Sequence, residues 1–165
     1  MGERQRIEVI ARVRPWFGEE EVVEVASETT VRLGAREFEF DAAFGSEATQ
    51  QDIYDKVRPL VRHVLEGGNA TVLAYGQTGS GKTHTMVGLM PLAVDELFAE
   101  AGADWHATCS YLEVYNDVVR DLFAEHAELT VQADAHECVR WSRSTPAGRT
   151  SVARVPVRTA QDARD

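Results

Sequence analysis

The hydrophobic pattern divides the chain into short strands, two helices and a second group of strands. Apolar and polar residues alternate from Ile7 to Arg14, which predicts a half-buried strand that ends at Pro15. Three short β-type runs follow, at 22–25, 30–33 and 37–40, and turn-forming residues separate them. We therefore expect a small antiparallel β lobe over about residues 22–40.

Two helices are expected in the middle of the chain. Apolar residues recur every three to four positions from Thr49 to Leu65, and Pro59 within this stretch predicts a kink. A second helix is expected to start near Lys82, to break near Gly88 and to resume at Pro91, because proline suits the first position of a helix.

Extended segments are expected on both sides of the second helix. Ala70–Tyr75 is an almost continuous apolar run, which is typical of a buried parallel strand. Trp105–Tyr115 has the pattern of a long strand, and Asp117–Phe123 that of a short helix. Shorter strands are expected at 129–133 and around 151–157.

The last residues have the pattern of a helix start. Thr159 and Asp162 have the spacing of a capping box, in which the threonine side chain accepts a hydrogen bond from the third helical residue. The sequence stops at Asp165, and so short a helix is marginal by itself. We therefore expect the sequence to stop inside a domain.

Composition and charge narrow the class of protein. With 165 residues and 44% hydrophobic content, the chain suits one domain or part of one. Its net charge of -10 disfavours nucleic acid as a partner of the whole surface, because phosphate binding needs clustered lysine and arginine. No apolar run approaches the roughly 18 residues of a spanning helix, so no membrane insertion is expected. Cys109 and Cys138 lack the spacing of a disulfide framework or a metal site, and we expect small core residues at both positions.

One segment carries recognisable chemistry. Residues 76–83 satisfy the P-loop pattern for phosphate binding, and the predicted strand before them and helix after them are the flanks that this loop requires. The candidate residues are Gly76, Gln77, Thr78, Gly79, Ser80, Gly81, Lys82 and Thr83.

Each residue type suits its position in such a loop. Glycine lets the backbone approach phosphate closely. Lys82 would place its ammonium between the β- and γ-phosphates, and Thr83 would offer its hydroxyl to Mg²⁺. The alternative is a glycine-rich turn that binds nothing, although no structural need explains lysine and threonine after three glycines.

The residues around this loop resemble the kinesin motor domain. Asn69–Met86 is similar to the kinesin P-loop segment almost letter for letter. Three further matches occur in the family's order: Ile7–Pro15, which ends in Arg-x-Arg-Pro; the stretch from Phe40 to Val61; and Ser110–Asp117, which has the letters Ser-Tyr-Leu-Glu-Val-Tyr-Asn-Asp.

The resemblance implies an α/β fold of the P-loop NTPase class, with a mixed central β-sheet flanked by helices. It implies a microtubule-dependent ATPase that uses ATP and Mg²⁺, found in the cytoplasm on the cytoskeleton, and it carries no indication of oligomeric state. Arg12, Pro15 and His84 would lie against adenine, since a guanidinium and an imidazole can stack on a purine. Without the resemblance, a solvated surface is the alternative for Arg12 and His84.

Two segments of the family pattern do not occur in these 165 residues. Asn-x-x-Ser-Ser-Arg-Ser-His and Asp-x-x-Gly-Ser-Glu are the switch regions, which position the attacking water and sense the γ-phosphate. We therefore expect the N-terminal half of a kinesin motor domain, truncated before the switch regions and lacking turnover by itself. The alternatives are a natural truncated protein that binds nucleotide or microtubules without motor activity, a gene fragment without separate function, and an unrelated P-loop enzyme.

A basic stretch lies near the end of this acidic chain. Residues 139–161 contain five arginines and no acidic residue. Part of the corresponding kinesin region faces tubulin, so the resemblance implies microtubule contacts through Arg140, Arg143 and Arg149. A structureless, merely solvated loop is the alternative.

Overall fold

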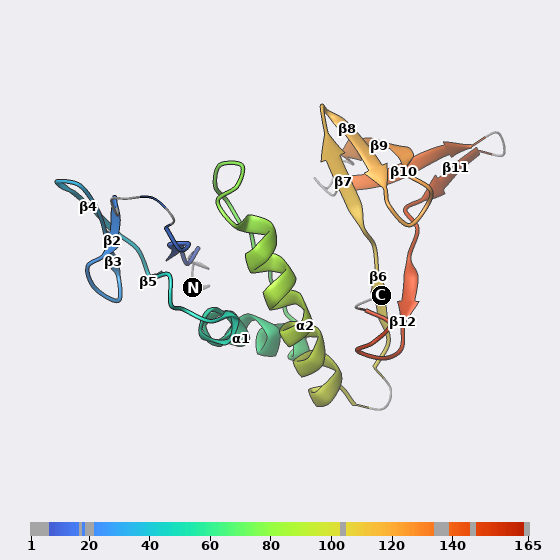
Figure 1. The fold of residues 1–165 in the computed structure, drawn as a ribbon. Coiled ribbons are helices and arrows are strands. Elements are labelled where there is room, and N and C mark those ends of the chain that lie inside the picture. The colour runs from blue at the N-terminus through green and yellow to red at the C-terminus, as the bar shows by residue number, and fades with distance from the viewer. Residues whose placement is uncertain are drawn as a thin grey trace, which may run out of the picture. The chain divides into compact units, whose positions relative to one another are not determined.

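The computed structural model describes residues 7–16, 18, 22–102, 105–133, 139–145 and 148–163. The chain divides into two compact units, Met1–Glu100 and Ala101–Asp165. The first runs from blue to yellow-green in Figure 1, and the second from yellow to red.

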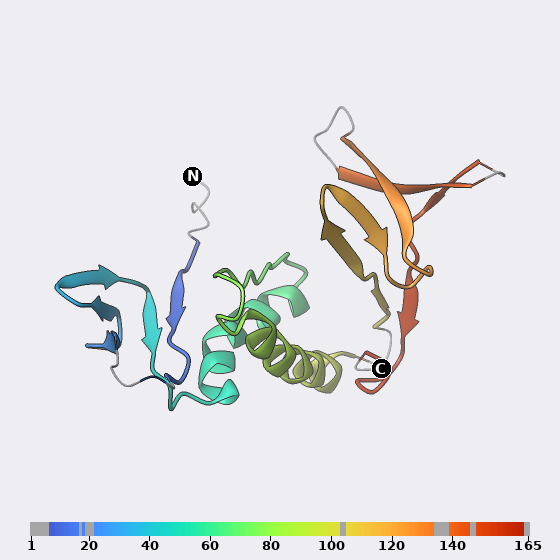
Figure 2. The same ribbon diagram turned by 45° about the horizontal axis from the view of Figure 1, so that its top comes forward.

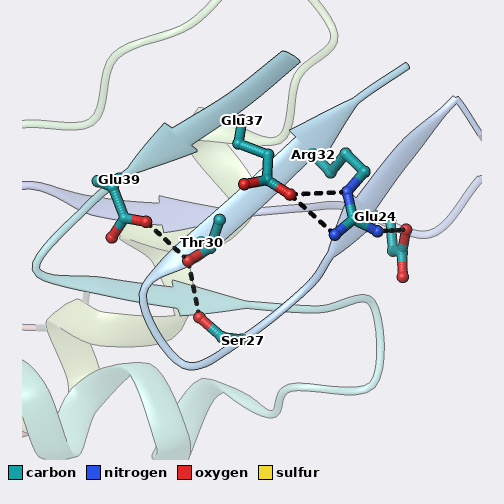
Figure 3. Close-up of polar contacts among 6 residues, drawn as sticks. All are labelled: Glu24, Ser27, Thr30, Arg32, Glu37 and Glu39. Atoms are coloured by element: carbon teal, nitrogen blue, oxygen red, sulfur yellow. Dashed lines mark hydrogen bonds and ion pairs between the residues drawn. The ribbon is translucent and has the colours of Figure 1, made fainter. Parts of the chain in front are cut away.

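The first unit contains the predicted β lobe. β2 (Val23–Val25), β3 (Thr30–Leu33) and β4 (Arg36–Glu39) form an antiparallel sheet in that order. Arg32 on the middle strand bridges Glu24 and Glu37 at 3.0 and 2.8 Å (Figure 3). The hydrogen bond with Glu37 is the main cause that raises the pKa of Arg32. Because these pairs are exposed, they favour the strand register more than they add stability.

β1 (Ile10–Arg12) and β5 (Ala42–Phe44) form a separate parallel pair. β1 confirms the predicted N-terminal strand over a shorter stretch, whereas β5 was not predicted because three residues are too few to show a period. Arg12 pairs with Phe44, the last residue of β5. This pairing brings Arg12 close to the start of the first helix.

α1 (Gln50–Leu65) confirms the predicted helix and continues through Pro59, while the kink expected at this proline stays a prediction. The Thr49 hydroxyl accepts a hydrogen bond from the Asp52 backbone, and the Asp52 carboxylate accepts one from the Thr49 backbone at 2.7 Å. The hydrogen bonds with Thr49 lower the pKa of Asp52. This capping box satisfies N–H groups that the first helical turn leaves unpaired.

α2 (Lys82–Glu100) packs against α1, as the two views in Figures 1 and 2 show. The core of this unit consists of Ile53, Tyr54, Val57 and Val61 from α1 together with Leu89 from α2. The predicted break near Gly88 is wrong, since one helix runs through both Gly88 and Pro91. Proline removes one backbone hydrogen bond, but packing on α1 holds the helix on both sides of it.

The strand predicted over 70–75 is not formed. The structure assigns no strand to this segment, and Leu73 and Tyr75 are 83% and 96% exposed. A strand requires a neighbour that supplies hydrogen bonds, and none of the strands in the described residues pairs with this segment. The composition of a buried strand is therefore present here without its partners.

The second unit consists of antiparallel strands. β6 (Ala107–Cys109) pairs with β12 (Val155–Val157). The other sheet runs in the order β11-β10-β9-β8-β7 and comprises β7 (Leu112–Tyr115), β8 (Val118–Asp121), β9 (Ala127–Ala133), β10 (Val139–Thr145) and β11 (Gly148–Ser151). The single strand predicted over 105–115 is thus divided into β6 and β7.

The short helix predicted over 117–123 is wrong. Asn116 and Asp117, with φ of 49° and 61°, form a two-residue turn, and Tyr115 pairs with Val118 across it. Positive φ at both central residues is the geometry of a type I′ hairpin, which Asn and Asp tolerate. The β-branched residues after the turn then favour the strand β8.

One polar side chain of the second unit is buried and one cysteine is exposed. Asp121 is 1% exposed, and its carboxylate accepts hydrogen bonds from the backbone of Phe123 at 3.1 Å and of Ala153 at 2.7 Å. Such bonds stabilise a buried carboxylate. Cys109 is exposed, so its predicted place in the core is wrong, and Cys138 lies outside the described residues.

The predicted capping box near the end of the chain is present. The Thr159 hydroxyl accepts from the Asp162 backbone at 3.1 Å, and the Asp162 carboxylate accepts from the Thr159 backbone at 3.0 Å. Residues 160–163 form a turn. Over the described ranges, no helix has the length and apolar character needed to cross a membrane.

A polar network joins the two helices beside their apolar contact. The Tyr54 hydroxyl donates to Glu96 at 2.7 Å, and Arg58 donates to the same carboxylate oxygen at 3.0 Å. Burial opposes ionisation of Glu96, but the hydrogen bonds from Tyr54 and Arg58 outweigh it and lower the pKa of Glu96. Burial and then the bond to Glu96 raise the pKa of Tyr54 to about 12. The contribution of Tyr54 to stability is therefore present below pH 10 and is lost as the pH rises through its folded pKa.

We expect Glu96→Gln to lower the free energy of unfolding by about 1–2 kcal/mol at neutral pH, since charged hydrogen bonds between α1 and α2 are lost. The lowered pKa of Glu96 means that this contribution is present above pH 4.5 and disappears as the pH falls below it. Urea unfolding against pH measures the difference, with the exposed Glu100→Gln on the same helix as control. An equal loss at acidic and neutral pH would contradict the electrostatic explanation.

Candidate functional site

The loop before α2 takes its shape from its glycines. Gly76, Gly79 and Gly81 have φ of 154°, 78° and 99°, values that residues with a side chain rarely adopt. A Cβ at Gly76 would also lie 2.5 Å from Ser80 Oγ. The Ser80 backbone donates to the Gln77 carbonyl at 3.1 Å and closes a turn inside the loop. This conformation therefore depends on glycine.

Lys82, the first residue of α2, folds back over this loop. Its Nζ donates to the carbonyl oxygens of Gly76 at 2.8 Å and Gln77 at 2.9 Å. The ammonium is thereby held at the N-terminus of a helix that has no acidic residue in its first turn. Peptide dipoles give this helix end a partial positive charge. Together these features suit an anion with several oxygens, such as a phosphate chain.

A cavity of about 540 Å³ joins the loop to the N-terminal strand. Its lining includes seven of the predicted site residues: Arg12, Pro15, Gly79, Ser80, Gly81, Lys82 and His84. Gly76 and Gln77 contact Lys82 through their carbonyl groups, whereas Thr78 and Thr83 are exposed. The volume lies within the range of small-molecule sites. The structure thus brings the phosphate-type loop and the residues expected at a base into one cavity.

Arg12 also has a structural role in this cavity. One terminal nitrogen, Nη1, donates to Gln50 Oε1 at 2.9 Å and to Thr85 Oγ1 at 3.0 Å. The other, Nη2, donates to the Ala48 carbonyl at 3.4 Å. Arg12 therefore joins β1 to the first turns of both helices.

Two residues at the site were missed by sequence reasoning. Arg14 donates from Nη1 to the carbonyl of Gly79, and its place in the Arg-x-Arg-Pro motif is the signal that could have identified it. Gln50 contacts Arg12 and His84, which lie 38 and 34 residues away in the sequence. No local pattern could have indicated contacts at such separations.

Other candidate chemistry belongs to the second unit or is absent from the described part of the chain. No group of three or more His, Cys, Asp or Glu side chains there could hold a metal ion. The Thr83 hydroxyl as a Mg²⁺ ligand stays a prediction. Arg140 and Arg143 lie on β10, and Arg149 on β11. A structureless loop is therefore wrong for these arginines, while their side chains lie outside the described ones.

Comparisons with known proteins give a consistent result. Residues 3–160 match the family model of the kinesin motor domain. The chain is 40% identical over 141 residues to kinesin-like protein KIN-14O of Oryza sativa subsp. japonica, with 74% of the chain and 23% of the rice protein covered. It is 35% identical over 150 residues to the kinesin-1 heavy chain of Rattus norvegicus, with 78% of the chain and 16% of the rat protein covered.

A solved structure of a fast kinesin, described for its ATPase mechanism and its interactions with microtubules, matches with a TM-score of 0.81 and 28% identity. The match covers 96% of this chain and 50% of that structure. The chain therefore spans half of the solved kinesin, and less than a quarter of the rice and rat relatives.

We expect Gly81→Ala to weaken binding of inorganic tripolyphosphate by about tenfold, since alanine at this φ costs roughly 1–2 kcal/mol and nothing lies close enough to clash. Calorimetric titration measures the affinity. Gly34→Ala is the matched control, because Gly34 has a φ of 58° and equally open surroundings but lies in the β3–β4 turn. Equal affinities in both variants would contradict the role of this loop.

Proposed function

The chain belongs to the kinesin motor-domain family, and from this premise we propose that it forms the ATP-binding part of a microtubule-dependent motor ATPase. The family and the α/β, kinesin-like fold class predicted from the P-loop segment are confirmed by these matches. Kinesin motor domains bind nucleotide, and members of the family are microtubule-stimulated ATPases that associate with the cytoskeleton.

The observation that carries the proposal is the shared cavity of the P-loop, Lys82 and the base-side residues. In this proposal the loop amides and the Lys82 ammonium bind the β- and γ-phosphates, while Arg12, Pro15 and His84 contact adenine. Thr83 would hold Mg²⁺ through its hydroxyl, and the ion would neutralise phosphate charge when bound. Positive groups around a phosphate chain bind the ground state, and by themselves they do not position an attacking water.

The 165 residues contain neither switch segment, so we propose that this chain binds ATP without motor-like turnover. The second candidate function is a non-catalytic protein that binds nucleotide or microtubules. Both candidates require nucleotide binding at the same loop. They differ in whether the complete gene product hydrolyses ATP in the presence of microtubules.

We expect Lys82→Ala to reduce ATP affinity by at least about tenfold, because the mutation removes a charged contact to phosphate. Binding of a fluorescent ATP analogue, with unlabelled ATP and GTP as competitors, provides the measurement. Arg36→Ala, which removes an exposed cation on β4, should bind as the unmodified chain does. Unchanged ATP binding in Lys82→Ala would exclude the P-loop as the nucleotide site, and equal competition by GTP would exclude the proposed adenine contacts.

The proposed lack of turnover has its own test. Phosphate release by the purified 165-residue chain, with and without microtubules, is expected to stay near background while ATP binds. Lys82→Ala, which is expected to bind ATP more weakly, supplies the background rate of phosphate release. Turnover at a motor-like rate would show that the switch segments are dispensable and would overturn this part of the proposal.

Microtubule binding is proposed to involve the basic residues on β10 and β11. We expect the double variant Arg140→Glu and Arg143→Glu to reduce co-sedimentation with microtubules at low salt, because the reversed charges would face an acidic surface. Arg36→Glu on β4 controls for a general effect of added negative charge. Unchanged co-sedimentation of the double variant would contradict the proposed role of these arginines in microtubule binding.

A further inference from the structure

We propose that Gln50 is a positioning residue for the base-binding side of the nucleotide site, and that it acts through His84 and Arg12. This inference rests on the function proposed above, because it assigns a role within the same site. Gln50 is the first residue of α1, whereas the residues it contacts belong to α2 and β1.

Both polar atoms of the Gln50 side-chain amide form hydrogen bonds. Its Oε1 accepts a hydrogen bond from Arg12 Nη1 at 2.9 Å, and its Nε2 donates to the His84 carbonyl at 2.9 Å. One planar amide therefore connects two of the three residues that the proposed function assigns to adenine. A carboxamide is a neutral group that can accept from a guanidinium through its oxygen and donate to a carbonyl through its nitrogen at the same time.

The same amide lies close to the imidazole of His84. Gln50 Nε2 is 3.2 Å from Nδ1 and 3.4 Å from Nε2 of the ring. Two nearly equal distances show that the amide nitrogen is not aligned with one ring nitrogen alone, since these nitrogens point in different directions. The Gln50 amide thus restricts both the backbone and the ring of His84.

Gly88 leaves the space that this amide occupies. A Cβ at Gly88 would lie 2.1 Å from Gln50 Cδ, 2.4 Å from Nε2 and 2.5 Å from Oε1. Gly88 is four residues after His84 in α2, so both residues lie on the same side of the helix. Any larger residue at position 88 would displace the amide from His84 and Arg12.

These contacts of Gln50 are with residues on the base side of the site. In the described part of the chain, the hydrogen bonds of the Gln50 side chain join it to Arg12 and His84, and none joins it to residues 76–81. The buried core of α1 begins three residues later, at Ile53. Loss of the amide should therefore change how a base is bound more than how a phosphate chain is bound.

The experiment compares ATP with inorganic tripolyphosphate, both with Mg²⁺, by calorimetric titration of the 165-residue chain. Gln50→Ala is expected to weaken ATP binding by about tenfold and to change tripolyphosphate binding by less than about twofold, because one hydrogen-bonding group is removed from the base side alone. Gln50→Glu keeps the acceptor for Arg12 but loses the donor to His84, and we expect the same selective loss. Gly88→Ala should reproduce it without a change at position 50.

Gln51→Ala is the matched control, since this neighbouring glutamine donates to Asp55 and should leave both affinities unchanged. If Gln50→Ala and Gly88→Ala weaken both ligands equally, Gln50 has only a structural role and the proposal is wrong. If they weaken neither, the amide has no positioning role. If the unmodified chain binds ATP no more tightly than tripolyphosphate, the proposed adenine contacts fail first, and the role of Gln50 fails with them.

Discussion

The packing of α1 on α2 is the interaction on which the candidate site depends. It buries one apolar face of α1 against Leu89, and Glu96 adds a directional contact to Tyr54 in the same interface. A one-turn slip between the helices would leave a phenol and a carboxylate without these partners, which is costly in a buried position. Since α2 begins at Lys82, this contact also sets where the P-loop stands relative to α1 and to Arg12.

The two sides of the site differ in how far apart their residues lie in the sequence. The phosphate side is local, because the glycines, Lys82 and the helix N-terminus follow one another in the sequence. The base side is assembled from β1, α1 and α2, and its contacts join residues up to 73 positions apart. Glutamine and arginine side chains supply those connections, while the backbone alone forms most of the phosphate side. The two sides should therefore respond differently to mutation.

The sequence predicted the features that depend on local chemistry. The capping box at Thr159 and the loop at 76–83 form as expected, since neighbouring residues supply every group they need. The capping box at Thr49 is equally local, although it was not predicted. Segment 70–75 has the composition of a buried strand but cannot become one without a neighbour. The run from Asp117 to Phe123 is predicted as a helix because the hydrophobic pattern of so short a segment is ambiguous. Asn116 and Asp117 instead form a hairpin turn, which two αL-tolerant residues between strand-like runs indicate. The contacts of Gln50 depend on tertiary structure, so no pattern in the sequence could reveal them.

The central claim is that one cavity binds a nucleotide through a local phosphate side and an assembled base side. Backbone amide hydrogen exchange of the chain, with and without ATP and Mg²⁺, tests it most directly, because it reports both sides in one measurement. We expect ATP to slow exchange at residues 76–83 and also around Arg12 and His84, whereas tripolyphosphate should slow it at 76–83 alone. Protection by ATP that is confined to other segments, or no protection at saturating ATP, would contradict the account.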